Sequence, residues 1–109
     1  MTTDNFQIRQ LADEFQPPDS GKQSVVLADD DNAKVVLFAF AAGDGPAEHI
    51  APLPAIIQIV KGEAEMTVGE KPVAGKPGTW IQKAAKTPHS IKANTPVIML
   101  LTLLKSGGA

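Results

Sequence analysis

From Lys22 onward the sequence alternates between short apolar runs and turn-forming residues, and this pattern restricts the fold more than any other feature. The runs are too short for typical helices but suit strands, and the residues between them are mainly Gly, Pro, Asp and Asn, which favour turns. Closely spaced short strands indicate an all-β sandwich or barrel rather than alternating strands and helices. The predicted strands are 22–28, 33–41, 55–60, 64–68, 79–82, 88–93 and 96–104.

The first 21 residues do not follow this pattern. We predict a short strand at about residues 6–8 and one helical turn over 11–15, followed by a loop containing Pro17, Pro18 and Gly21. A chain of 109 residues fits one domain. The predicted organisation is an N-terminal arm and loop over 1–21, a barrel over 22–105 and a flexible tail over 106–109.

Composition excludes several classes of function. The net charge is −2 and the ten Lys and Arg residues are scattered, which argues against nucleic-acid binding. Cysteine is absent, so disulfides, thiolate metal sites and a cysteine nucleophile are excluded together. No apolar stretch approaches the roughly 20 residues that span a bilayer. The N-terminus lacks the basic and apolar regions of a signal peptide. We therefore expect a cytoplasmic protein without a membrane or nucleic-acid partner.

The last predicted strand also carries information about assembly. Residues 97–104 are apolar except for Thr102, whereas a half-exposed strand would alternate between apolar and polar residues. We expect this strand to be covered on both faces. In so small a barrel another subunit would provide the second cover, which predicts a homodimer, although a long apolar run can also be buried within one chain.

Glycines and histidines recur at fixed intervals between Gly43 and Asn94. His49 follows Gly43 after five residues, and Gly62 follows His49 after twelve. These positions resemble the first motif of the cupin family: glycine, five residues, His-x-His, three or four residues, glutamate, six residues and glycine. In this register the second histidine position holds Ala51 and the glutamate position holds Ala55.

The second half of the region resembles the second cupin motif: glycine, five residues, Pro-x-Gly, two residues, histidine, three residues and asparagine. Gly78 and His89 occupy the glycine and histidine positions. The proline, glycine and asparagine positions hold Ala84, Lys86 and Ala93. Fifteen residues, 63–77, separate the two motifs, which is similar to the spacing in small microbial cupins.

The resemblance implies an all-β fold, the double-stranded β-helix or jelly-roll barrel of the RmlC-like, cupin-2 type conserved barrel proteins. It also implies a metal site, since the family uses three histidines and one glutamate to bind Fe, Mn, Ni, Cu or Zn. Only His49 and His89 remain at ligand positions. They are the candidate metal ligands, and three readings stay open: a metal completed by water or substrate, metal-free ligand contacts, or no functional role.

The substitutions at positions 51 and 55 remove polar bulk and predict a larger, more apolar cavity, which is the usual form of a small-molecule site. Phe38, Phe40 and Trp80 are expected in the core more than in substrate stacking, and Lys83 is expected as a solvated surface charge. A lysine at the barrel mouth is the alternative, since it would attract an acidic ligand. The candidate pocket residues are His49, Ala51, Ala55, His89, Phe38, Phe40, Met66 and Trp80.

Three functions are compatible with these residues, and whether the chain is an enzyme stays open. The first is a non-catalytic or weakly catalytic cupin that binds a small apolar or mildly acidic molecule in its barrel. The second is a metal-dependent dioxygenase or isomerase that uses His49, His89 and an unidentified third ligand. The third is an accessory protein whose barrel mainly provides a dimerisation surface.

Overall fold

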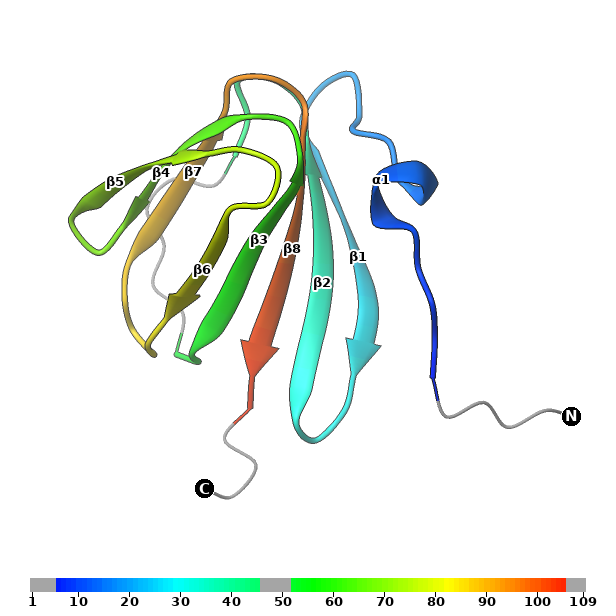
Figure 1. Ribbon diagram of the computed structural model, residues 1–109, viewed down its shortest axis with the longest axis vertical. Helices are drawn as coiled ribbons and strands as arrows, with labels where there is room; N and C mark the ends of the chain where they lie inside the picture. Colours follow the sequence, from blue (N-terminus) through cyan, green and yellow to red (C-terminus); the bar gives the residue numbers. More distant parts are fainter. Residues whose placement is uncertain (1–5, 46–51, 106–109) are drawn as a thin grey trace, which may run out of the picture.

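The computed structural model describes residues 6–45 and 52–105 and contains two antiparallel β-sheets (Figure 1). The larger sheet has the strand order β1-β2-β8-β3-β6, and the smaller sheet has the order β5-β4-β7. The strands are β1 (Lys22–Asp29), β2 (Ala33–Phe40), β3 (Ala55–Lys61), β4 (Ala64–Val68), β5 (Lys71–Gly75), β6 (Trp80–Lys83), β7 (His89–Ala93) and β8 (Val97–Leu104). The all-β fold predicted from the strand pattern is confirmed, and the two antiparallel sheets are consistent with the jelly roll that the cupin resemblance implies.

All seven predicted strands agree with the observed ones to within one residue at each end, and 79–82 is displaced as a whole by one residue to β6. Strand β5 was not predicted, because its sequence starts with Lys71 and Pro72 and resembles a turn. It pairs with β4 through a two-residue connection at Gly69 and Glu70, so that Val68 lies opposite Lys71.

The N-terminal prediction is confirmed in part. The helical turn exists as α1 (Leu11–Glu14), where the backbone N–H of Gln10 donates to the Glu14 carboxylate at 2.6 Å. The predicted strand at residues 6–8 is wrong, since this segment has no regular structure. A hydrogen bond from the Gln7 side-chain amide to the Leu27 carbonyl oxygen links this segment to the larger sheet. Among the described residues, no helix is long and apolar enough to cross a membrane.

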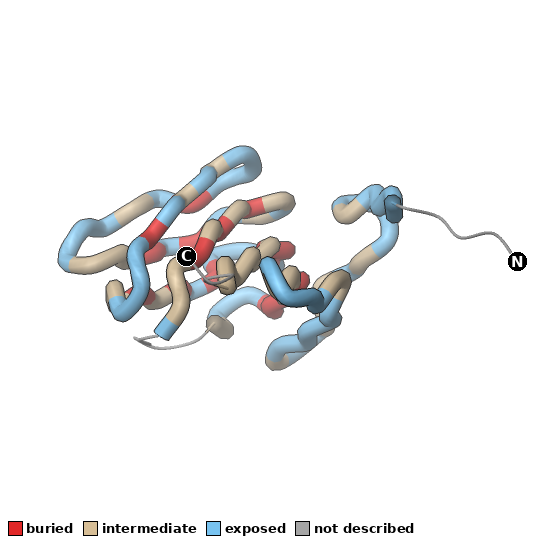
Figure 2. Tube along the Cα trace, turned by 90° about the horizontal axis from the view of Figure 1, so that it is seen from below, coloured by how far each residue is buried: buried red, intermediate tan, exposed pale blue. Residues whose placement is uncertain are grey.

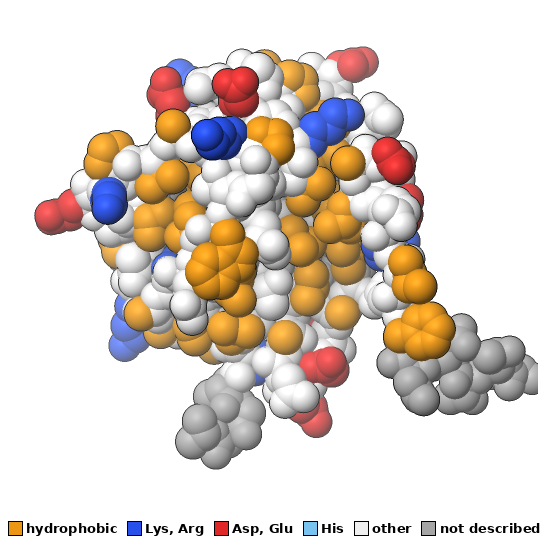
Figure 3. Space-filling view, viewed as in Figure 1, with side chains coloured by type: hydrophobic (Ala, Val, Ile, Leu, Met, Phe, Trp, Pro, Cys, Tyr) orange, Lys and Arg blue, Asp and Glu red, His pale blue; other side chains and the backbone are white. Residues whose placement is uncertain are grey.

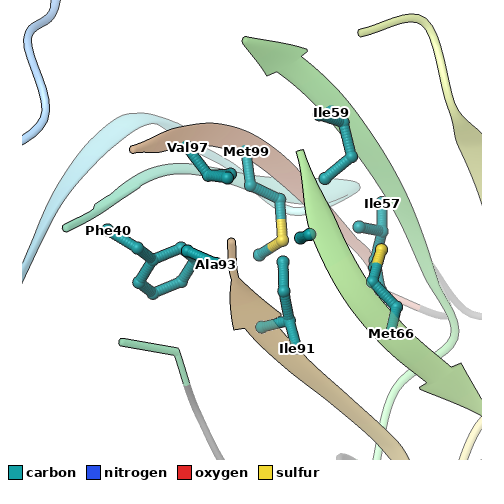
Figure 4. Packing of buried hydrophobic residues seen from close by; sticks show 9 residues of the cluster. Phe40, Ile57, Ile59, Met66, Ile91, Ala93, Val97 and Met99 are labelled. Atoms are coloured by element: carbon teal, nitrogen blue, oxygen red, sulfur yellow. The ribbon is translucent and has the colours of Figure 1, made fainter. Parts of the chain in front are cut away.

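The core lies between the two sheets, where alternating residues of facing strands meet (Figure 4). On β3 the exposure alternates strictly, with Ala55, Ile57 and Ile59 buried and the residues between them partly exposed. The buried cluster comprises Phe40, Ile57, Ile59, Ala64, Met66, Ile91, Ala93, Val97 and Met99. One face of each strand therefore builds the interior.

Strand β8 occupies the middle of the larger sheet, between β2 and β3. Its first three residues, Val97, Ile98 and Met99, are at most 4% exposed, and Leu100–Leu104 are partly exposed. The first three residues of β8 are therefore buried within one chain, as the prediction of cover on both faces requires, and the rest of the strand is only partly covered.

Two motif positions show how the turns are built. Gly62 adopts a φ of +87°, and a Cβ atom there would collide with the carbonyl oxygen of Pro96, so both the conformation and the close approach require glycine. Lys86, which occupies the glycine position of the second motif, adopts a φ of +66°. The turn before β7 therefore keeps the left-handed conformation without its glycine, at a cost of about 1 kcal/mol.

Candidate functional site

A cavity of about 470 Å³ lies on the inner side of the larger sheet. Most of its lining is apolar, and the charged or titratable groups among the described lining residues are two lysines and one histidine. The lining residues are Lys22, Phe38, Phe40, Pro52, Leu53, Lys83, His89, Met99, Leu101 and Leu103. Three of the predicted pocket residues, Phe38, Phe40 and His89, line this cavity.

The alternation of β2 and β8 places the apolar wall. Phe38 and Phe40 are two residues apart on β2 and share one face, where their rings stack with centroids 5.9 Å apart and an interplanar angle of 8°. On β8, Met99 lies directly opposite Phe38, and Leu101 and Leu103 continue the same face. The cavity therefore has one aromatic and one aliphatic wall from adjacent strands.

Lys83 is the main correction to the sequence analysis. The prediction of a solvated surface charge is wrong, because Lys83 is only 3% exposed and lines the cavity. It is the last residue of β6 and lies directly opposite the buried Ala55 of β3. Its Nζ atom has no hydrogen-bond partner among the described residues. Burial lowers the pKa of Lys83 below its ordinary value of 10.5, since a desolvated ammonium group is disfavoured.

His89 is the one predicted metal ligand whose position the structure describes. It begins β7, is 7% exposed and lines the cavity. The other candidate ligand, His49, and the neighbouring Ala51 lie outside the described residues.

The remaining predicted pocket residues separate into different environments. Ala55 is fully buried on the inner face of β3, opposite Lys83. Met66 belongs to the core cluster between the sheets and does not line this cavity. Trp80 is 55% exposed and lies opposite Gln58, so the prediction that it belongs to the core is wrong. Its neighbour Ile81 takes the inner face instead.

The described residues do not fit the metal site that the cupin motifs imply. The glutamate position holds the methyl group of Ala55, and the residue opposite it is a lysine, which repels a cation. No group of three His, Asp or Glu side chains that could hold a metal occurs within residues 6–45 and 52–105. A transition-metal site needs more nitrogen and oxygen ligands than the single described imidazole supplies.

Several lining residues were not predicted. Met99, Leu101 and Leu103 alternate along β8, and this period of two is a signal in the sequence, but an entirely apolar run conceals which face is inner. Lys83 is two residues from Ile81, so both point to the same side of the strand. Lys22, Pro52 and Leu53 come from strand ends and loops, whose positions depend on the fold as a whole.

A second hollow, of about 790 Å³, lies over the smaller sheet. Its lining mixes Glu65, Thr67, Ser90 and Lys92 with apolar residues, and the Thr67 and Ser90 hydroxyl groups hydrogen-bond to each other at 2.6 Å. Of the predicted pocket residues that the structure describes, Met66 alone lines it. It is therefore the weaker candidate for the predicted site.

No protein-family model and no curated protein sequence matches the chain. Solved structures do match it. A cupin superfamily protein from Desulfitobacterium hafniense has 24% identity and a TM-score of 0.82, with 92% of each chain covered. A conserved protein of unknown function from Streptococcus pyogenes has 23% identity and a TM-score of 0.81, covering 94% of this chain and 90% of that one.

A third structure, a cupin 2 conserved barrel domain protein from Leptotrichia buccalis, has 28% identity and a TM-score of 0.81. The match covers 89% of this chain and 47% of that protein. The strand topology, the register of the motif residues and these three similarities agree. The chain is a small barrel protein of the cupin, RmlC-like, fold.

Proposed function

We propose that this cupin-fold protein binds a small, mainly apolar molecule inside its barrel and does not depend on catalysis for its function. The observation that carries the proposal is the cavity of about 470 Å³ between the aromatic wall of β2 and the aliphatic wall of β8. Small-molecule sites typically have volumes of roughly 300–1,000 Å³ and are lined by apolar side chains with a few polar groups.

The chemistry of the lining favours binding over catalysis. Nucleophilic or general acid–base catalysis needs paired groups within hydrogen-bond reach, such as a nucleophile and its base. Among the described lining residues, the titratable groups are Lys22, Lys83 and His89, and no carboxylate or hydroxyl group accompanies them. These three residues are suited to recognising a ligand rather than transforming it.

Leu103→Trp tests this proposal, because it fills the cavity from β8. Leu104→Trp is the matched control, since the adjacent residue lies on the opposite face of the strand. We expect 1-octanol to raise the melting temperature of the wild-type protein and of Leu104→Trp, but not that of Leu103→Trp. Equal stabilisation of both variants, or no stabilisation of the wild-type protein, would contradict binding in the barrel.

The alternative, a metal-dependent enzyme, has a separate test. The metal content of the purified wild-type protein and of the His89→Ala variant is measured by mass spectrometry. The measurement is repeated after both proteins have been incubated with Fe, Mn, Ni and Zn. Stoichiometric metal that is lost in the variant would favour the metal-dependent alternative. Metal below one tenth of an equivalent throughout would support the metal-free proposal.

We also propose that the protein forms a homodimer. Large hydrophobic residues are exposed on the N-terminal arm and on the edge strand β1, with Phe6 at 70%, Ile8 at 74% and Val26 at 53% exposure. Figure 2 shows mostly exposed residues along this arm, and Figure 3 shows hydrophobic side chains gathered over β3, β8 and β2. A two-fold contact would cover the same patches on both copies at once, which makes a second copy the favoured partner.

A further inference from the structure

The position of Lys83 in the cavity needs an explanation beyond apolar binding. A lysine side chain is rarely fully buried unless it is paired. Lys83 is 3% exposed, and its Nζ atom is without a hydrogen-bond partner in the part of the chain that the structure describes. Leaving such a group buried, charged and unpaired destabilises the fold, because the ammonium group loses its hydration without gaining a partner. The Lys83 ammonium group therefore has no counter-charge from the described residues around the cavity.

The charged side chains among the described lining residues are those of Lys22 and Lys83, and both are positive. Lys22 lies exposed on β1 and reaches the same cavity as Lys83 and His89, and none of the described lining residues is acidic. Directly across from Lys83, where the cupin motif has a glutamate, β3 carries Ala55. Within residues 6–45 and 52–105, no carboxylate of the cavity lining is present to accept a hydrogen bond from Lys83.

We propose that the ligand is an amphiphilic monocarboxylate, whose carboxylate group accepts hydrogen bonds from the Lys83 ammonium group while its apolar body lies against Phe38, Met99 and Leu101. This inference rests on the proposed function and names its ligand class. One buried ammonium group neutralises one negative charge. Lys22, the other lysine of the lining, is exposed on β1, so a monoanion matches the single buried ammonium group better than a dianion such as a phosphate monoester.

Isothermal titration at pH 7 with octanoate and 1-octanol tests the inference, because the two ligands share a chain length and differ in charge. We expect wild-type protein to bind octanoate about 10–100-fold more tightly than 1-octanol, as a charge-assisted hydrogen bond predicts. Lys83→Met should reduce the affinity for octanoate to that for 1-octanol and leave 1-octanol binding unchanged. Retained 1-octanol binding also shows that the variant is folded with an intact cavity.

Lys86→Met is the matched control, since it removes the same charge from an exposed position three residues along the chain. It should keep the wild-type preference for octanoate. Equal affinities of wild-type protein for the two ligands, or an unchanged octanoate affinity in Lys83→Met, would overturn the inference while the proposed function stands. Failure of both ligands to bind the wild-type protein would overturn the proposed function as well.

Discussion

Ala55 and Lys83 lie directly opposite each other across the β3–β6 strand pair, and both are buried on its inner face. Directly opposite residues of an antiparallel pair have Cβ atoms roughly 5 Å apart, close enough for their side chains to interact. The methyl group at position 55 thus accompanies a buried lysine that has no partner among the described residues. The cupin motifs imply a glutamate metal ligand at position 55, whereas this cavity has a methyl group there and a lysine opposite it.

Ala55→Glu should give Lys83 a carboxylate partner within the protein. The new ion pair would raise the pKa of Lys83 and compete with the carboxylate of a ligand. We expect the preference for octanoate over 1-octanol to fall by about tenfold or more, as measured by titration calorimetry. Ala55→Gln adds nearly the same volume without charge and should keep the preference. If the two variants showed the same preference for octanoate, a carboxylate at position 55 would not compete for Lys83, and the proposed contact between Lys83 and the ligand carboxylate would be contradicted.

Lys83→Met should stabilise the protein, because it replaces a buried amine by an apolar side chain of similar length. We expect a gain of about 1–3 kcal/mol in the free energy of unfolding at pH 7, measured by urea denaturation. Lys86→Met, at an exposed position, should change the stability by less than about 0.5 kcal/mol.

The gain from Lys83→Met should depend on pH. Because burial lowers the pKa of Lys83, the unfolded chain binds more protons than the folded one between the folded-state pKa and 10.5. Wild-type stability therefore rises with pH through this window relative to Lys83→Met. The other groups at the cavity, Lys22 and His89, are present in both proteins and cancel in the comparison. If Lys83→Met gained as much free energy of unfolding at pH 10.5 as at pH 7, the result would contradict a buried Lys83 with a lowered pKa.

Two motif glycines should differ sharply in their tolerance of alanine. Gly43 and Gly62 have nearly equal φ values, +88° and +87°, but a Cβ atom at Gly43 would meet no atom of the described residues within 4 Å. Gly43→Ala should therefore cost only the strain of a left-handed residue, about 1 kcal/mol. Gly62→Ala adds a collision with the Pro96 carbonyl and should cost about 2–4 kcal/mol. Equal losses in chemical denaturation would show that the turn between β3 and β4 can relax.

The proposed homodimer should depend on the N-terminal arm. Phe6→Asp combined with Ile8→Asp places two charges on the exposed apolar positions and should shift the protein to the monomer in sedimentation-velocity experiments. Lys92→Asp changes the net charge by the same amount on the smaller sheet and should leave the dimer intact. A monomeric wild-type protein at 100 μM, or a dimer that survives the double substitution, would contradict the proposal.

The strands were predictable because each apolar run ends at a residue that breaks regular structure. Strand β5 escaped prediction because its start, Lys71 and Pro72, has the composition of a turn, and pairing with β4 determines its conformation. The opposite error occurred at residues 6–8, which have the composition of a strand but no partner strand in the described structure. Strand formation depends on pairing, which a local pattern does not specify.

The site was less predictable than the fold. Lysine is usually exposed, so the composition alone placed Lys83 on the surface, and only its register with Ala55 on β3 shows that it points inward. Trp80 shows the converse, since a large aromatic residue was expected inside and lies outside because Ile81 occupies the inner face. A one-residue difference in strand register exchanges the two faces, and this decides which side chains meet the cavity.

The most direct test of ligand binding in the barrel uses methionine methyl groups as NMR probes. Met99 lines the cavity, whereas Met66 lines the hollow over the smaller sheet. With ¹³C-methyl-labelled protein and saturating octanoate, we predict intermolecular nuclear Overhauser effects from the ligand chain to the Met99 methyl group, absent in Leu103→Trp. Effects confined to Met66, or none at saturation, would contradict the assignment of this cavity as the binding site.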